Sequence, residues 1–211
     1  MKLARAGRIS PVGAALLELG PDQTARLAGR AGDRLFLALD GTVEVISGSG
    51  SQLMSAGDAA VVYGAGTCTV RTREGVRALS VWLDREAEGL APHAVVQRAA
   101  GSVTTMEFNT RFRRLPLLPG SEPHDWGSAL AHLAPLQCTT PHHHIDDETF
   151  FIVRGRGRLR IGAEDRLVEP GDVVHLPSGQ EHTLENLTPS ELTFFTTWWT
   201  EAGVTPPARS P

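Results

Sequence analysis

The chain has 211 residues, of which 41% are hydrophobic and 21% are charged, a composition that is ordinary for a globular protein. The formal net charge is −4, so there is no basic field of the kind that binds nucleic acid. No apolar run approaches the roughly 18 residues of a membrane helix, and the short apolar run near the start is interrupted by Glu18, which makes a poor signal peptide. Two cysteines, Cys68 and Cys138, do not suggest a disulfide framework. We therefore expect a cytoplasmic protein whose partner is a small molecule, with no nucleic acid and no membrane.

Short runs rich in β-branched and aromatic residues predict strands throughout the chain. They include residues 42–46, 67–72, 78–82, 126–133, 149–153, 158–161, 173–176, 183–186 and 192–199. The segment from Ala25 to Arg34 contains two glycines and is interpreted as a loop. Residues 90–120 are interpreted as a connector with possible strands at 95–97 and 103–108.

The two halves of the chain are similar when one is shifted by 114 residues without a gap. Gly41 and Gly155 each close an apolar run, and Gly57 and Gly171 each open another. A repeat unit of this length indicates a domain duplication. The expected domains are residues 1–95 and 96–203, followed by a proline-rich disordered tail at 204–211.

Four side chains that can ligate a metal lie between Pro141 and Asn186. In a strand, His142 and His144 would point to the same side, because side chains alternate between faces. Glu148 begins the next apolar run, and a turn containing proline and glycine precedes His182. Three imidazoles and one carboxylate form a mixed nitrogen and oxygen donor set that suits a divalent first-row metal.

The spacing of these residues resembles the two signature motifs of the cupin superfamily. The motifs read H-x-H-x₃-E-x₆-G from His142 to Gly155 and G-x₅-P-x-G-x₂-H-x₃-N from Gly171 to Asn186. The resemblance implies a small antiparallel jelly-roll barrel with a metal in its mouth. It also implies that the ligands are His142, His144, Glu148 and His182. One departure is Leu136, which stands where the first motif often has glycine, and which affects the turn entering the barrel more than the ligands.

All four ligands are absent from the equivalent positions of the first half, which are Ala28, Arg30, Arg34 and Cys68. Two guanidinium groups at ligand positions would repel a cation. Together with the resemblance, this predicts an all-β bicupin with a degenerate N-terminal barrel and a metal-binding C-terminal barrel, packed as an intramolecular pseudo-dimer. We expect one divalent transition metal per chain, Fe(II) or zinc first, with manganese, nickel and copper also compatible, in a monomer or homodimer.

Several side chains around the motifs have a functional and a plainly structural interpretation. His175 and His132 are candidate proton-transfer groups or ordinary core or surface histidines. Asp146 and Asp147 are either solvated or orient a ligand, and His143 faces away from the metal by strand parity. Candidate substrate-contacting residues, for which core packing or solvation is the alternative, are Phe150, Ile152, Leu184, Phe195, Trp199, Cys138 and Arg111.

The ligand set favours a catalytic metal over a structural one. Structural zinc sites are closed and rich in cysteine, whereas these four positions hold no cysteine and leave room for water, substrate or dioxygen. The first hypothesis is a metal-dependent enzyme that acts on a small organic molecule with oxidoreductase chemistry, as in many bicupin dioxygenases. The second is an isomerase, lyase or N–N bond-forming cupin of natural-product biosynthesis, because the run FFTTWWT resembles the second-barrel ending of hydrazine synthetase-like cupins. The third is a non-catalytic cupin that binds a small molecule.

Overall fold

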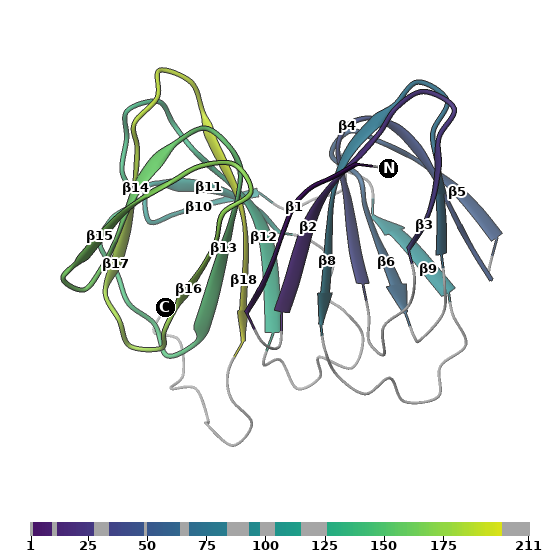
Figure 1. Cartoon of the computed structure of the whole chain (residues 1–211). Coiled ribbons are helices and arrows are strands. Elements are labelled where there is room, and N and C mark those ends of the chain that lie inside the picture. The colour runs from purple at the N-terminus through teal and green to yellow at the C-terminus, as the bar shows by residue number, and fades with distance from the viewer. Residues whose placement is uncertain are drawn as a thin grey trace. The chain divides into compact units, whose positions relative to one another are not determined.

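The computed structural model of the chain describes residues 2–9, 12–27, 34–48, 50–63, 68–83, 93–97, 104–114 and 126–199. Every regular element in these ranges is a β-strand, which confirms the all-β fold (Figure 1). The same ranges hold no helix that is long and apolar enough to cross a membrane. The chain divides into two compact units, Met1–Ser102 and Val103–Pro211. The expected tail at 204–211 lies outside the described residues, and the pairing of two barrels stays a prediction.

The N-terminal unit is a curled antiparallel sheet. Its strands are β1 (Lys2–Ile9), β2 (Val12–Leu19), β3 (Thr24–Leu27), β4 (Arg34–Ser47), β5 (Gly50–Ser55), β6 (Ala59–Tyr63), β7 (Cys68–Arg71), β8 (Val76–Leu83) and β9 (His93–Gln97). The strand order is β1-β2-β8-β4-β6-β9, and β5 and β7 pair with the second half of β4. Because β4 is long enough to pair with four strands, it carries the curl from one side of the barrel to the other.

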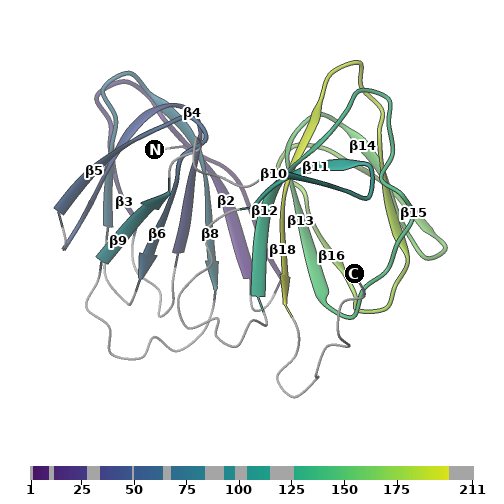
Figure 2. The ribbon, with the colours of Figure 1, turned by 180° about the vertical axis from the view of Figure 1, so that it is seen from behind.

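The C-terminal unit contains two antiparallel sheets (Figures 1 and 2). Its strands are β10 (Thr104–Glu107), β11 (Thr110–Arg114), β12 (Trp126–Leu133), β13 (Asp147–Arg154), β14 (Gly157–Ile161), β15 (Glu164–Val168), β16 (Val173–Leu176), β17 (His182–Asn186) and β18 (Leu192–Trp199). One sheet has the order β10-β11-β12-β18-β13-β16 and the other the order β15-β14-β17. Buried residues alternate with exposed ones along β14, so one face of this strand meets the core cluster that Leu159 and Phe194 share.

The two units repeat the same strand arrangement. The order β2-β8-β4-β6 in the first unit corresponds to β12-β18-β13-β16 in the second. A Cβ atom added to Gly13 would collide with the ring of Trp82, and one added to Gly127 would collide with the ring of Trp198. In each unit a tryptophan side chain therefore packs over a glycine of the neighbouring strand, a detail that the two units share.

One turn of the repeat also matches in detail. The Asp58 carboxylate accepts a hydrogen bond from the Ser55 N–H at 3.0 Å, and the Asp172 carboxylate accepts one from the Glu169 N–H at 2.8 Å. In both units the glycine before this aspartate has a positive φ. Aspartate stabilises such turns through local hydrogen bonds to the backbone, and glycine reaches positive φ without a steric penalty.

Two sequence interpretations need correction. The segment from Ala25 to Arg34, interpreted as a loop, begins inside β3, whose Ala25 side chain is buried and whose backbone pairs with β7. The arginine-rich residues 109–114 of the connector contain β11, which lies between the edge strand β10 and β12 in the larger sheet (Figure 2). In both cases the pairing partner is distant in sequence, and pairing and burial outweigh the local signals of glycine and charge.

The turn before the first motif has a left-handed residue in each unit. Asp22 has φ 55° and Leu136 has φ 56°, and each follows a proline. The N–H of Asp22 donates to the Arg73 carbonyl at 3.2 Å, and that of Leu136 to the Thr188 carbonyl at 3.3 Å. The position where the cupin motif often has glycine therefore does adopt the conformation that glycine favours. Leucine is a costly occupant, whereas aspartate tolerates this conformation.

Replacing Leu136 with asparagine is expected to raise the free energy of unfolding by about 1 kcal/mol, because asparagine relieves the left-handed strain. Little apolar burial is lost, since the Leu136 side chain is 68% exposed. Chemical denaturation of the two proteins measures the difference. The matched control is Asp22→Leu, which should destabilise the first unit by a similar amount. Unchanged stability in Leu136→Asn would contradict this account.

Candidate metal centre

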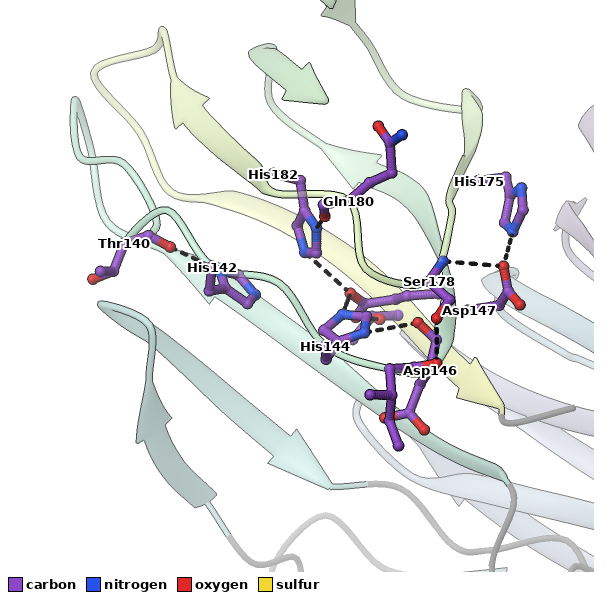
Figure 3. Close-up of polar contacts among 12 residues, drawn as sticks. Thr140, His142, His144, Asp146, Asp147, His175, Ser178, Gln180 and His182 are labelled. Carbon is purple, nitrogen blue, oxygen red and sulfur yellow. Dashed lines mark hydrogen bonds and ion pairs between the residues drawn. The ribbon is translucent and has the colours of Figure 1, made fainter. Parts of the chain in front are cut away.

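The backbone brings the two motifs together at one end of the C-terminal unit (Figure 3). His142 and His182 form an isolated antiparallel bridge, with the His182 N–H donating to the His142 carbonyl at 2.9 Å and the reverse bond at 3.2 Å. The Gly179 N–H donates to the His144 carbonyl at 2.7 Å. Glu148 lies in β13, next to the turn that His144 enters. All four predicted ligands are thus held by paired backbone.

The side chains of these residues converge. The ligand nitrogens of His142, His144 and His182 lie within 4.8 Å of one another. Glu148 Oε2 lies 2.9 Å from His144 Nε2 and 3.5 Å from His182 Nε2. The carboxylate therefore contacts two of the three imidazoles directly.

Each imidazole is oriented by the same kind of hydrogen bond. The Nδ1 atoms donate to backbone carbonyls two residues away: His142 to Thr140 at 2.7 Å, His144 to Asp146 at 2.8 Å and His182 to Gln180 at 2.9 Å (Figure 3). A proton fixed on Nδ1 leaves Nε2 as the basic nitrogen. Asp146 therefore orients a ligand through its backbone carbonyl.

The donor set fits a metal ion. His182 Nε2 is buried and has no hydrogen-bond partner among the described residues, although buried polar atoms are nearly always satisfied. The ligand nitrogens of His142 and His144 lie within 4.8 Å of that of His182, and His144 Nε2 and His182 Nε2 both lie beside Glu148 Oε2. Nitrogen and oxygen donors without cysteine suit a first-row divalent metal in an open site.

The Glu148 carboxylate is buried, with 7% of the residue exposed. Burial raises its pKa, but the contacts with His144 and His182 and the hydrogen bond from Thr196 Oγ1 to Oε1 outweigh burial and lower the pKa to about 2. The group is therefore ionised at neutral pH and available as an anionic ligand.

The pKa values of two histidines shift in opposite directions. Burial lowers the pKa of His144, but the hydrogen bond and charge of Glu148 more than reverse this and raise it. Burial lowers the pKa of His142, and the hydrogen bond to Thr140 only partly offsets that effect. Between these two candidate ligands, protons would compete with a metal more strongly at His144.

Among the predicted substrate-contacting residues, three lie in the barrel core. Phe150, Ile152 and Leu184 are 3%, 0% and 0% exposed and belong to one cluster. The Phe150 ring also meets His182 edge-on, with centroids 6.1 Å apart. Phe150 therefore forms part of the wall behind the imidazoles.

The predicted residues Phe195 and Trp199 lie on the other face of β18. Strand alternation places them opposite Thr196, whose hydroxyl reaches Glu148. Trp199 stacks on His175, with centroids 6.0 Å apart. The face could not be chosen from hydropathy, because β18 is buried on both faces as far as Thr197.

Cys138 is exposed instead of lining the interior. The parity argument that linked it to His142 fails because this segment makes only isolated bridges, at Cys138 and His142, and does not form a continuous strand. His143 is exposed, in agreement with its expected outward orientation.

The polar candidates make ion pairs away from the cluster of imidazoles. Glu191 accepts from Arg111 at 2.8 Å and lies 2.9 Å from His132 Nδ1. Burial lowers the pKa of His132, and Glu191 opposes this effect. His175 Nε2 lies 2.7 Å from Asp147 Oδ1 (Figure 3). Asp147 and His175 pair just beside Glu148 on the opposite face of β13, so they support the ligand strand.

Two residues at the site were missed by the sequence argument. Thr196 donates to Glu148, and strand alternation in β18 would have placed it beside Phe194 on the inner face. Phe108 stacks on His142 from the turn between β10 and β11. Its only signal in the sequence is the neighbouring Asn109, a residue that favours tight turns between strands.

A comparison with known protein families gives one match. Residues 129–198 match the family model described as Cupin domain. The matched range contains all four predicted ligands. This supports the fold and the motif resemblance in the C-terminal unit.

Similar curated proteins cover only part of this chain. One is an acireductone dioxygenase from Sulfurihydrogenibium sp., 42% identical over 48 residues, which are 21% of this chain and 27% of that protein. Another is an uncharacterized protein from Streptomyces coelicolor, 36% identical over 44 residues, 21% of this chain and 42% of that protein. The chain therefore aligns with less than half of the length of either relative.

Solved structures resemble this chain over most of its length. AerE from Microcystis aeruginosa has a TM-score of 0.73 at 11% identity, covering 93% of this chain and 91% of that one. Oxalate decarboxylase from Bacillus subtilis has a TM-score of 0.70 at 14% identity, covering 90% and 69%. At these identities the likeness concerns the fold, and it confirms a cupin-type arrangement of strands.

Metal affinity is expected to depend on pH through His144. A metal competes with the proton that Nε2 carries only in the imidazolium form, and the raised pKa of His144 means that this proton competes at higher pH than at an ordinary histidine. Below that pKa, the apparent affinity should fall about tenfold per pH unit, and above it the affinity should level off. Competition titrations with a chelator between about pH 5 and 8 measure this profile.

The control is Glu148→Gln, which removes the group that raises the pKa of His144. Its affinity should be weaker throughout, and the onset of the pH-dependent loss should move to lower pH. An onset that stays in place in Glu148→Gln would show that another group sets the profile.

Proposed function

We propose that the C-terminal unit binds one divalent transition metal through His142, His144, Glu148 and His182 and acts on a small organic molecule. The observation that carries this proposal is the convergence of three imidazoles on a buried carboxylate, with the buried His182 Nε2 only 3.5 Å from Glu148 Oε2 and without a well-formed hydrogen bond among the described residues. The His142 and His144 imidazoles and the ionised Glu148 carboxylate lie around His182. Such an arrangement is costly to bury without a cation at its centre.

The protein's own residues prepare the site. Backbone carbonyls hold the three Nδ1 protons, so that each imidazole presents Nε2 without rearrangement. Thr196 holds one oxygen of Glu148 and leaves Oε2 toward the imidazoles. Three neutral imidazoles and one carboxylate around a divalent ion leave a net charge of about +1. When bound, such an ion supplies Lewis acidity or, as iron, redox chemistry.

Oxidoreductase chemistry of the dioxygenase type is the reaction class we favour. The support is the 42% identity with part of an acireductone dioxygenase and the open, cysteine-free ligand set. Fe(II) is the metal this chemistry favours. Zinc, manganese, nickel and copper also accept these donors.

Metal-dependent chemistry without net oxidation is the second candidate. Solved structures of oxalate decarboxylase share the fold at 14% identity, so the same barrel serves a lyase. Isomerisation and N–N bond formation in natural-product biosynthesis belong to this class, as the run FFTTWWT near the end of the domain suggests. A binding protein without catalysis is the third candidate.

We also propose that the N-terminal unit is a degenerate barrel without a metal. Arg34 lies at the start of β4, and Glu148 lies at the corresponding place in β13. The Arg34 guanidinium is 3.5 Å from Ser80 Oγ and lies over the Trp82 ring, 5.5 Å from its centroid. Cys68, at the position of His182, is 1% exposed, and burial raises its pKa. A cation and a buried neutral thiol disfavour a divalent metal. The other equivalents, Ala28 and Arg30, lie outside the described residues.

Elemental analysis of the purified chain is expected to give about one metal per chain. His144→Ala should lose more affinity than the about 10–100-fold that loss of an outer partner of a metal ligand costs. His143→Ala, a change at an exposed neighbour, and Cys68→Ser should leave the metal content unchanged. Two metals per chain, or one metal lost on changing Cys68, would refute the degenerate barrel.

Oxygen consumption distinguishes the first two candidates. The iron-loaded protein, assayed over a panel of small organic acids, enediols and amines, should consume dioxygen in a substrate-dependent way. His144→Ala should abolish the consumption, and His143→Ala should retain it. Turnover of a substrate by the zinc-loaded protein without dioxygen would instead favour metal-dependent isomerase or lyase chemistry over the dioxygenase reaction.

A further inference from the structure

Phe108 lies at the tip of the hairpin between β10 and β11 and stacks on His142. The two ring centroids are 3.7 Å apart and the ring planes differ by 8°. The contact joins the connector hairpin to a residue of the metal motif. The Phe108 residue is 42% exposed, so filling the core does not explain its position.

The backbone at this tip is strained. Phe108 has φ 49° and Asn109 has φ 60°. Two successive left-handed residues are the requirement of a tight hairpin turn that favours asparagine and glycine. Asn109 meets this requirement, whereas a bulky aromatic residue at the preceding position is an outlier. Strain that surrounding contacts maintain at a candidate site motivates a functional hypothesis.

The surrounding contacts hold the tip against the ligand segment. The Thr140 N–H donates to the Phe108 carbonyl at 3.0 Å, and the Asn109 side chain donates to the Cys138 carbonyl at 2.9 Å. The Thr140 carbonyl in turn accepts the Nδ1 proton of His142 at 2.7 Å. A single residue, Thr140, thus links the hairpin tip to the imidazole through its two backbone groups.

His142 depends on this hairpin more than the other imidazoles do. His144 is held by Glu148 at 2.9 Å, and His182 is 1% exposed and packs against the Phe150 ring. His142 is partly exposed, and Glu148 contacts the other two imidazoles. Stacking against the flat Phe108 ring fixes the plane of the His142 imidazole. The hydrogen bond from Nδ1 to the Thr140 carbonyl fixes the rotation of the ring within that plane, so the two contacts together set the direction of Nε2.

We propose that Phe108 is a positioning residue for the metal: its ring sets the plane of His142, aims Nε2 at the other donors and shields one face of the imidazole from water. The inference rests on the proposed metal site. The backbone strain at Phe108 is then maintained because asparagine or glycine, which would relax the turn, would remove the ring.

The test compares metal binding and thermal stability in the full chain, with Co(II) and Zn(II) as probes. Phe108→Asn suits the left-handed backbone and lacks the ring. It should keep or raise the melting temperature of the metal-free protein, lower metal affinity about tenfold and alter the visible absorption of bound Co(II). Phe108→Tyr and Phe108→Trp keep a flat ring and should retain the metal affinity and the Co(II) spectrum of the wild-type chain.

Two further variants control for lost apolar surface. Met106→Asn removes another exposed apolar side chain from the same hairpin and should leave affinity and spectrum unchanged. Phe108→Leu keeps an apolar side chain but lacks a flat ring. Its metal affinity and its Co(II) spectrum should therefore change as they do in Phe108→Asn. Wild-type affinity and spectrum in Phe108→Leu or Phe108→Asn would overturn the positioning role. Failure of the wild-type chain to bind either metal would instead overturn the metal site itself.

Discussion

The buried negative charge of Glu148 is the constraint on which the metal centre depends. An unpaired carboxylate costs several kcal/mol to bury, and this one is compensated by His144, His182 and Thr196. These partners come from the motif loop, from β17 and from β18, while the carboxylate itself belongs to β13. One anion therefore fixes the mutual positions of three strands and a loop at this end of the barrel. A site held in this way is organised before a metal arrives, and a bound metal replaces repulsion among clustered imidazoles with coordination.

Comparison of the two units distinguishes the residues that the fold requires from those that a metal site would require. Both units keep the glycine and aspartate of one turn, with φ 89° at Gly57 and 96° at Gly171, and both seat a tryptophan over a glycine. The charges differ: Arg34 meets Ser80 in the first unit, whereas Glu148 meets Thr196 in the second. The strand arrangement thus persists with a cation in place of the carboxylate. Backbone geometry and core packing specify the barrel, and the ligands are additions to it.

The sequence predicted the all-β fold, and it predicted four candidate ligands whose side chains the structure brings close together, because both depend on local patterns. Motif spacing sets short turns, and the turn that ends at His182 brings it back to His142 by two backbone hydrogen bonds. Parity failed for Cys138, because alternation holds only along a continuous strand. Alternation also could not show which face of β18 points toward Glu148, because both faces of this strand are buried as far as Thr197. The stacking of Phe108 was beyond a local pattern, because it depends on a hairpin far from the motif in sequence that closes the edge of the sheet.

Backbone strain at this end of the barrel has two different meanings. Leu136 and Phe108 both hold bulky side chains at positive φ, and both lie near the segment that leads into His142. The Leu136 side chain is 68% exposed, and its turn is reproduced by Asp22 in the unit where Arg34 and Cys68 stand at the positions that correspond to Glu148 and His182. The turn therefore needs the left-handed conformation but not leucine. Phe108 has a similar steric strain, but its ring stacks on the imidazole of His142, a candidate ligand. The contact, and not the strain, distinguishes a residue that serves the metal from one that the fold merely tolerates.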